Sequence, residues 1–524
     1  MILSRRRVLQ SGAAALASAA AAGATSSAAS AAPSAAGPLF DVDLSAPGTP
    51  LKHFWEGCVG GDHAKQLLRR DFQDQLTTAH RDLGVQAIRM HGVLAPQMSV
   101  YSTGRPAGWS PNAYSFFNVH QAYDHLVANG MHPYVELSAM PEDMAAPGGS
   151  GIFYYSFLNS PPKSFTDWGA LIGAFVSDLV DRYGLAEVRN WPFEVWNEPN
   201  LGFWGGTAQQ YNQLYQAAAE AIKNVDASIP VGGPATDGGG LSFLQAFLDF
   251  VEASHVPIDF VSSHGYENNV LAGPRGVADI FAPTRAVIPA GLPYYVSETG
   301  ASYLDNVSDV WDTSYAAAFW VKAVAECDGI TDILSLWTFS DIFEEEPQAA
   351  NIFHGGFGAL TMYATPKPIY RAFQLLHQLG DRRLPATATG VPQTVGMLAA
   401  TSARGGYDLV IYNHSLPNGA AAGGPGQFST APATQQAITV RVQGALATHT
   451  ASLTRIDANH GNTRQAWYDL GKPVYPTNAQ IEKIAVASEV SPMPIAPVRS
   501  PGNGQDLTFE IVLPAEGVAA LHLR

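Results

Sequence analysis

The sequence predicts an α/β protein in which a (β/α)8 TIM barrel is followed by an antiparallel β-domain that resembles a β-sandwich. Between about residues 50 and 380, eight short apolar runs alternate with amphipathic helical stretches. The runs are nearly continuous in apolar residues, as expected for parallel strands that are buried on both faces. After about residue 383, short alternating runs are separated by Gly, Pro and Asn, which is typical of antiparallel strands.

The eight predicted strands alternate with predicted helices along the chain, as a repeated strand–helix unit requires. They are HFWEGCVG from His53, VQAIRMHG from Val85, HPYVELSA from His132, PFEVWNEP from Pro192, IPVGGPA from Ile229, DFVSSHGY from Asp259, PYYVSETG from Pro293 and DILSLWTF from Asp332. Helices are predicted between them, for example over 71–84, 118–130 and 166–184, each ending in a glycine suited to a helix C-cap. Eight units over roughly 330 residues fit a (β/α)8 barrel. The alternative, a doubly wound sheet, usually has fewer units and often a glycine-rich phosphate loop, which this sequence lacks.

The chain of 524 residues is too long for a single core, so it is expected to form two or three domains. We predict a twin-arginine signal peptide at 1–31, an N-terminal linker or strand at 32–49, the barrel at 50–382 and the β-domain at 383–524 with a loop at 418–425. The signal peptide is indicated by three consecutive arginines, an Ala-rich stretch and the small-residue sequence Ala-Ser-Ala at 29–31. We therefore expect export to the periplasm or the medium.

The composition excludes several classes of protein. The net charge is −16, and removing the three leader arginines would lower it to about −19. Such a surface repels nucleic acid and suits a neutral or positively charged small substrate. Nowhere after the leader are there eighteen unbroken apolar residues, so no membrane span is expected. The oligomeric state is not indicated.

Two cysteines, Cys58 and Cys327, lie far apart in the sequence. One bridge between them is an open alternative, but two free buried thiols are favoured because twin-arginine substrates fold before export, in a reducing compartment. Neither cysteine has the spacing of a structural zinc site, so no metal is predicted. The sequence also lacks a GxSxG nucleophile elbow.

Polar side chains gather at the carboxyl ends of the predicted strands. In a barrel these ends meet at one mouth, where the chemistry lies. The residues are Arg89 and His91 after the second strand, Glu136 on the third, Asn197 and Glu198 after the fourth, His264 and Tyr266 after the sixth, Glu298 after the seventh and Trp337 after the eighth.

Glu198 and Glu298 have the character of a catalytic pair. They end strands four and seven, on opposite sides of the predicted mouth. Hydrolysis of a glycosidic bond needs one carboxyl group that donates a proton and one carboxylate that attacks or activates water. A glutamate at a strand end commonly just caps the following loop. The buried strand, the adjacent Asn197 and the second glutamate favour catalysis instead.

Four segments of the sequence resemble glycoside hydrolase family 39, the family of β-xylosidases and α-L-iduronidases. They are FEVWNEPNLGFW around Glu198, LGVQAIRMHGVL at 83–94, DFVSSHGY at 259–266, and LWTFSDIFEEEP with FHGGFGAL at 336–360. The resemblance covers about residues 50 to 380. It implies a TIM barrel and a retaining mechanism, with no metal or organic cofactor.

The resemblance also implies roles for individual residues. Glu198 corresponds to the acid/base, Glu298 to the nucleophile and Asn197 to the residue that binds the sugar 2-hydroxyl. The other residues expected to contact the sugar are His264, the apolar platform Trp337, Glu344 and a second acidic contact, Glu346.

Three further residues are predicted from their places at the mouth. His91 and Tyr266 are expected to bind substrate, and Arg89 to support a carboxylate such as Glu298 electrostatically. Two of them have a purely structural alternative, namely a buried ion pair for Arg89 and a satisfied core histidine for His91.

The sequence therefore predicts an exported, retaining exo-glycosidase, with β-D-xylosidase as the favoured activity. Its partner would be a small carbohydrate, such as a xylo-oligosaccharide or an aryl or alkyl glycoside, and not a nucleic acid. Two alternatives stay open: another sugar (a β-glucoside, β-galactoside, α-L-arabinopyranoside or iduronide), or a non-catalytic carbohydrate-binding protein. Gly300 and Ala301, shortly after Glu298, are expected to leave extra room that admits a larger sugar.

Overall fold

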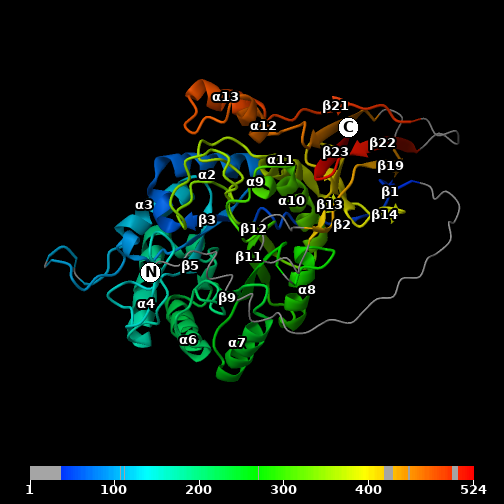
Figure 1. The fold of residues 1–524 in the computed structure, drawn as a ribbon. Helices are drawn as coiled ribbons and strands as arrows, with labels where there is room; N and C mark the ends of the chain where they lie inside the picture. The colour runs from blue at the N-terminus through cyan, green and yellow to red at the C-terminus, as the bar shows by residue number, and fades with distance from the viewer. Residues whose placement is uncertain are drawn as a thin grey trace, which may run out of the picture.

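Eight parallel strands close into a barrel, which confirms the predicted TIM-barrel fold (Figure 1). The computed structural model describes residues 37–106, 108–110, 112–269, 271–417, 429–445, 449–498 and 506–524. The predicted signal peptide at 1–31 and the loop at 418–425 lie outside these ranges. The barrel strands are β3 (Val59–His63), β4 (Ala87–His91), β5 (His132–Leu137), β8 (Phe193–Val195), β9 (Val231–Thr236), β10 (Phe260–Tyr266), β11 (Tyr294–Gly300) and β12 (Ile333–Leu336).

Helices surround the barrel and begin and end at the expected signals. Ser164 caps α4 by accepting a bond from the Asp167 amide, and Thr207 and Gln210 form a capping box at α6. The predicted helices at 71–84, 118–130 and 166–184 correspond to the first three of the main helices. These are α2 (Arg70–Leu83), α3 (Phe117–Ala128), α4 (Phe165–Tyr183), α6 (Ala208–Val225), α7 (Leu241–Ser254), α8 (Val277–Val287), α10 (Ser314–Cys327) and α11 (Pro368–His377).

The first barrel strand begins later than its apolar run predicts. The strand starts at Val59, whereas residues 53–58 form turns in which Phe54 and Trp55 are buried. The Phe54 carbonyl accepts a bond from the Leu334 amide at the start of β12, and the Glu56 carbonyl accepts one from the Gln86 amide just before β4. This apolar segment therefore closes the amino-terminal end of the barrel.

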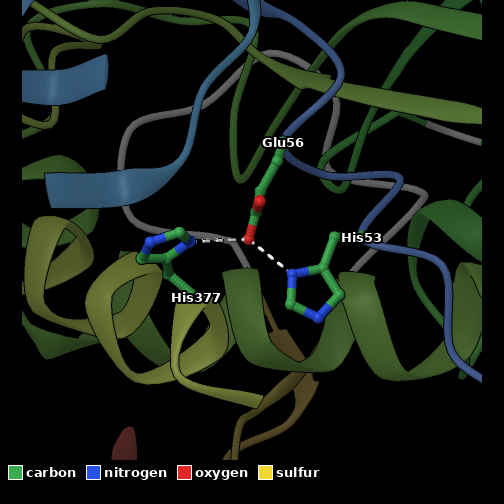
Figure 2. A group of neighbouring side chains, drawn as sticks. All are labelled: His53, Glu56 and His377. Carbon is green, nitrogen blue, oxygen red and sulfur yellow. Dashed lines mark hydrogen bonds and ion pairs between the residues drawn. The ribbon is translucent and has the colours of Figure 1, made fainter. Parts of the chain in front are cut away.

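A histidine–glutamate–histidine cluster ties this first segment to the last helix of the barrel. Figure 2 shows the Glu56 carboxylate between two imidazole rings, with Oε1 lying 2.7 Å from His53 Nδ1 and 3.0 Å from His377 Nδ1. Burial alone would raise the pKa of Glu56, but the two histidines outweigh it and lower that pKa. Gly84, the left-handed C-cap of α2 with φ 73°, lies against the cluster. A Cβ there would approach Glu56 Oε2 and His377 Nδ1 to 2.5 Å, so only glycine fits.

Two further sheets form a sandwich beside the barrel. One sheet has the order β14 (Ala386–Thr389), β1 (Leu39–Asp43), β19 (Gln436–Gln443), β22 (Leu507–Leu513). The other has the order β2 (Thr49–Pro50), β13 (Leu379–Arg383), β15 (Val395–Ser402), β16 (Tyr407–Asn413), β23 (Gly517–Leu523), β20 (Ala451–Ile456), β21 (Met493–Pro494). Their facing side chains share one apolar core, including Phe40, Val440, Leu409 and Leu521. The N-terminal strand β1, blue in Figure 1, pairs in parallel with β19, far along the chain.

The sandwich also carries a helical insertion, α12 (Thr463–Asp469) and α13 (Asn478–Val486). Trp467 and Ile484 of these helices pack against Ile352 and Phe353, in the loop that follows β12. Arg464 Nη1 lies 2.7 Å from Asp309 Oδ1 in the loop that follows β11. The two domains therefore meet at loops that leave the carboxyl ends of barrel strands.

The thiols of Cys58 and Cys327 are both buried and not bonded to each other, which confirms the predicted free state. Burial raises the pKa of Cys58 to about 12, so this thiol stays protonated. Within the ranges that the structure describes, no helix has both the length and the apolar character needed to cross a membrane.

A fully buried lysine stabilises the loops after β11 and β12. Lys367 Nζ lies 2.8 Å from Asp312 Oδ1 and 2.6 Å from Asp341 Oδ2. The two carboxylates in turn accept bonds from the amides of Gly355 and Gly358. One ammonium group thus compensates two buried carboxylates and fixes the loop that contains both glycines.

Replacing Lys367 with methionine should destabilise the protein strongly. It would leave Asp312 and Asp341 buried without their cation, and breaking a buried ion pair in this way costs about 3–5 kcal/mol. The measurement is the midpoint of thermal or urea unfolding, with Lys52→Met as control because Lys52 is exposed. Equal midpoints for the two variants would contradict this role of Lys367.

Candidate active site

Glu198 and Glu298 face each other at the carboxyl end of the barrel. Glu298 lies within β11 and Glu198 lies three residues beyond the end of β8, and both side chains are almost completely buried. One oxygen of each carboxyl group and His264 Nδ1 all lie within 4.8 Å of one another. Retaining glycosidases have carboxyl groups about 5–5.5 Å apart, whereas inverting ones need about 6.5–9.5 Å. The spacing fits direct attack by one carboxylate.

The chain leaves β8 through a strained backbone. Trp196 has φ 73° and Glu198 has φ 42°, values in the left-handed region that L-residues seldom adopt. The indole of Trp196 is anchored by a 3.0 Å bond from Nε1 to the Phe203 carbonyl, and the Glu198 amide donates to the Ala235 carbonyl at 3.0 Å. Strain of this kind clusters at functional sites because the surroundings must hold it.

Arg89, on β4, joins three buried carboxylates beneath the mouth. Its guanidinium lies 2.6 Å from Glu194 Oε2, 2.8 Å from Glu136 Oε2 and 2.8 Å from Glu298 Oε1. A fourth bond, 3.0 Å long, runs from Nη2 to Asn197 Oδ1. Burial alone would lower the pKa of Arg89, but the three glutamates raise it well above its usual value. Arg89 is therefore a fixed cation that stabilises negative charge on Glu298.

His91 adds a second positive charge beside Glu298. Its Nδ1 lies 2.7 Å from Glu136 Oε2, and its Nε2 lies 3.7 Å from Glu298 Oε1 and 3.6 Å from Glu345 Oε1. Burial opposes the charged form, yet the neighbouring glutamates, above all Glu136, raise the pKa of His91 to about 10. His91 is thus an imidazolium at neutral pH.

Tyr266 and His264, both on β10, contact the two catalytic candidates, and His264 Nδ1 lies 3.7 Å from Glu298 Oε1 as well as close to Glu198. The Tyr266 hydroxyl donates to Glu298 Oε2 at 2.6 Å. His264 Nδ1 lies 2.9 Å from Glu198 Oε1, and His264 Nε2 lies 3.2 Å from Ser297 Oγ. Strand β10 therefore orients both carboxyl groups at once.

Trp337 follows β12 and lies next to His91, with ring centroids 4.7 Å apart. Its indole occupies the space beside Gly60 of β3, where a Cβ would collide with the ring. This close approach explains the glycine and places an aromatic face in the same group of side chains as Glu298.

Comparison with models of protein families confirms the resemblance to a glycoside hydrolase family. The model for glycosyl hydrolases family 39 matches residues 39–505. This chain belongs to that family. A β-xylosidase from Caldicellulosiruptor saccharolyticus is 36% identical over 486 residues, which cover 90% of this chain and 95% of the relative. A β-xylosidase from Geobacillus stearothermophilus is 31% identical over 457 residues, covering 83% and 86%.

Solved structures agree. The crystal structure of a monomeric β-xylosidase from Caulobacter crescentus CB15 superposes with a TM-score of 0.78 at 30% identity, covering 93% of this chain and 99% of that one. The chain is therefore a glycoside hydrolase, and its family uses a retaining mechanism.

Three consecutive glutamates, at 344–346, follow β12 in this family 39 enzyme, and they differ in burial and in the residues that they contact. Glu345 is the buried one, facing His91. Glu344 is half-buried, with Oε2 lying 3.1 Å from His63 Nε2 and Oε1 lying 3.5 Å from Arg69 Nη1. Glu346 is also half-buried. The sequence predicts sugar contacts for Glu344 and Glu346, and none for Glu345.

The expected open space beside Gly300 is absent. A Cβ on Gly300 would lie 2.6 Å from Trp311 Cη2 and 3.3 Å from Tyr266 Cδ1, so aromatic side chains already fill that space. Ala301 is buried as well. The expectation that these small residues admit a larger sugar is therefore wrong, because an indole from α9 (Ser308–Trp311) occupies the room they leave.

Glu194 was not among the residues predicted from the sequence. It accepts bonds from Arg89, from the Tyr134 hydroxyl at 3.0 Å and from the Ser297 hydroxyl at 2.8 Å. The signal was present, since Glu194 is a single acid between Phe193 and Val195 in a short buried strand. Side chains alternate along a strand, so a central acid must point into the barrel when its neighbours point outward.

A third carboxyl group lies near Glu198. Asp237 follows β9 and accepts a 2.6 Å bond from Asn200 Nδ2. Burial and the charge of Glu198 raise the pKa of Asp237 to about 6.

Three groups in the described part of the chain have ligand types that suit a metal ion: His53, Glu56 and His377; Asp62, His63 and Glu344; and Glu198, His264 and Glu298. In each group a histidine nitrogen lies within hydrogen-bond distance of a carboxylate oxygen.

Proposed function

We propose that this family 39 enzyme is a retaining exo-β-D-xylosidase that releases terminal β-xylosyl residues. The observation that carries the proposal is the placement of Glu198 and Glu298, with oxygens within 4.8 Å of each other at one barrel mouth and Arg89 paired with Glu298. The two relatives described above, 36% and 31% identical, are both named β-xylosidase, which supports xylose as the sugar.

In the first step, Glu298 attacks the anomeric carbon while Glu198 gives its proton to the departing oxygen. The bond from the anomeric carbon to the leaving group breaks and a bond to Glu298 forms. Arg89 and Tyr266, 2.8 Å and 2.6 Å from the two oxygens of Glu298, orient the carboxylate and stabilise its charge. In the second step, Glu198 takes a proton from water, which displaces Glu298 from the sugar.

The other predicted residues are proposed to bind the sugar around this centre. Asn197 is held by Arg89 and would bind the 2-hydroxyl. Trp337 would supply an apolar face, with His91, His264 and Tyr266 beside it. At the acidic end of the pocket we propose contacts from Glu344 and Glu346.

We propose that a hairpin beside His91 bounds one side of the sugar site, which would favour action on a terminal sugar. The hairpin of β6 (Gly151–Ile152) and β7 (Phe157–Leu158) brings Phe153 over His91, with ring centroids 5.7 Å apart. The Tyr154 amide donates to the Glu345 carbonyl at 2.8 Å. This contact joins the hairpin to the loop after β12, beside His91.

A panel of aryl glycosides tests the sugar. We expect the aryl β-xyloside to have the highest kcat/KM, ahead of the β-glucoside, β-galactoside and α-L-arabinopyranoside. The margin over the two hexosides should be about 10- to 200-fold, because their extra carbon group at C5 changes discrimination by that much. An iduronide should be poor, since Arg89 and His91 are already engaged by the enzyme's own carboxylates. Another sugar at the head of the panel would refute the xyloside assignment and leave the two-glutamate mechanism intact.

We also propose that the chain is exported through the twin-arginine route and cleaved after Ala31. The Arg-rich leader and the Ala-Ser-Ala sequence support the proposal. Cell fractionation and N-terminal sequencing of the mature enzyme test it. A cytosolic enzyme that keeps Arg5–Arg7 would contradict it.

A further inference from the structure

We propose that His414, a residue of the β-sandwich, is a positioning residue for the nucleophile Glu298, acting through Glu267 and Tyr266. The inference rests on the proposed function, in which Glu298 attacks the sugar. It assigns to the accessory domain a part in aligning the catalytic carboxylate.

A chain of buried charged side chains crosses the junction between the domains. Glu267, which directly follows β10, receives a 2.8 Å bond from Lys322 Nζ of α10. Its other oxygen lies 2.6 Å from Nε2 of His414, the residue that follows β16. His414 Nδ1 lies 3.0 Å from Glu516 Oε2, in the turn before β23. Lys322, Glu267 and His414 are almost completely buried, and Glu516 is 23% exposed.

The charges in this chain are fixed by their neighbours. Burial alone would raise the pKa of Glu267, but His414 and Lys322 outweigh it and hold that pKa at about 2. Burial would also lower the pKa of His414, whereas Glu267 and Glu516 raise it. The Tyr315 ring packs edge-on against the imidazole at 4.4 Å. The Glu267 carboxylate is thus ionised and held in place from both domains.

The main chain of Glu267 transmits this position to the active site. Its amide donates to the Gly300 carbonyl at 2.9 Å, two residues beyond Glu298. Tyr266, the preceding residue, pairs with Gly300 in the β10–β11 ladder and donates its hydroxyl to Glu298 Oε2. The next residue, Asn268, bonds Ser302 and the Tyr303 amide. Moving the Glu267 side chain would therefore move both strand ends that hold the nucleophile.

Stability alone is a weak reason for such a chain. A buried ion pair commonly stabilises a fold no more than well-packed apolar side chains of similar volume would. What directional charged hydrogen bonds add is a defined position for each group. Here the positioned group is Glu267, which is adjacent in the chain to Tyr266, the tyrosine that bonds the nucleophile Glu298.

The sandwich offers a matched control in His522, on β23. His522 is buried too, with Nδ1 lying 2.7 Å from Asp408 Oδ1 and Nε2 lying 2.9 Å from Thr454 Oγ1. All three residues of this second cluster belong to the sandwich strands β16, β20 and β23. Replacing either histidine with leucine removes an imidazole from a buried carboxylate, but only His414 reaches the barrel.

The experiment measures the rate at which 2-deoxy-2-fluoro-β-xylosyl fluoride labels Glu298. In that reaction the carboxylate forms a bond to the anomeric carbon and fluoride leaves without needing a proton, so the rate reports the nucleophile and not Glu198. We expect His414→Leu to slow labelling about 10- to 100-fold, as a displacement of up to 1 Å would. The His522→Leu enzyme should be labelled at the wild-type rate. The His414→Gln enzyme, which keeps an N–H donor at this position, should recover most of the wild-type labelling rate.

A double mutant tests the route through Tyr266. In the Tyr266→Phe background, His414→Leu should add little further loss, because residues that act in one chain are not additive. Equal labelling by the two leucine variants would overturn the proposal, and so would full additivity with Tyr266→Phe. If His414→Leu does not fold, Glu516→Gln makes the same comparison. A slower rate supports the proposal and an unchanged rate overturns it.

Failure of the proposed function has a different signature. A wild-type enzyme that the fluoroxyloside does not label would count against xylose as the sugar. The leucine variants are then compared by kcat on the best aryl glycoside of the panel, with the same criteria.

Discussion

Replacing Glu298 with alanine should lower kcat on an aryl β-xyloside by roughly 10⁴-fold or more, on the scale seen when a covalent catalyst is lost. The reason is geometric, because Glu298 is the carboxylate that faces Glu198 across the mouth of the barrel. Glu194 and Glu136 lie beneath Glu298 and are already paired with Arg89. Steady-state kinetics of the purified variant is the measurement, and its unfolding midpoint should be checked to show that the loss is not one of folding.

Added azide should restore part of the activity of Glu298→Ala. The small anion can enter the space left by the carboxylate and attack the anomeric carbon once, so the product should be the α-xylosyl azide, with inverted configuration. NMR of the product distinguishes it from the β-anomer. Near-normal turnover without azide would remove Glu298 from the mechanism.

The barrel was predictable because its strands are buried on both faces. A run such as VQAIRMHG must be apolar along its length, and the few polar residues it carries, Arg89 and His91, mark the mouth. The same reasoning located Glu198 and Glu298, since each stands where a buried strand ends. These signals are local in sequence, which is why they can be read without a structure.

Features that depend on distant pairing were not predictable in the same way. The segment at 32–49 was predicted only as a linker or strand, and nothing in LFDVD shows that Val42 pairs with Val442 across the sandwich. The apolar run from His53 resembles a strand, yet its first residues close the end of the barrel, because hydrophobicity does not specify which surface a segment covers.

The sequence alone does not show which of the three consecutive glutamates after β12 is buried. Three consecutive glutamates point in different directions when a loop turns, and only the turn decides which one is buried. Sequence position favoured Glu344, but His63 and Arg69 draw its carboxylate to the side of the mouth, while Glu345 turns in toward His91. Likewise, Gly300 was expected to leave room, and Trp311 fills it from the following loop.

Replacing Glu198 with alanine should give a loss that depends on the leaving group. A 2,4-dinitrophenolate departs without a proton, so its release should be only modestly slower. The group that leaves xylobiose is a xylose unit, which departs as an alkoxide unless its oxygen is protonated. Hydrolysis of xylobiose should therefore fall by about 10²- to 10⁴-fold, the usual contribution of a general acid. The measurement is kcat/KM for a series of aryl xylosides and xylobiose, compared between wild type, Glu198→Ala and the isosteric Glu198→Gln.

Azide should act on Glu198→Ala at the second step and not the first. The glycosyl-enzyme on Glu298 still forms from an activated substrate, and azide then displaces Glu298 from the face where water would attack, without needing a base. Two inversions leave the configuration of the substrate, so the product should be the β-xylosyl azide, opposite to that of Glu298→Ala. An equal loss for good and poor leaving groups, or an α-azide product, would show that Glu198 is not the acid/base and that the two glutamates exchange roles.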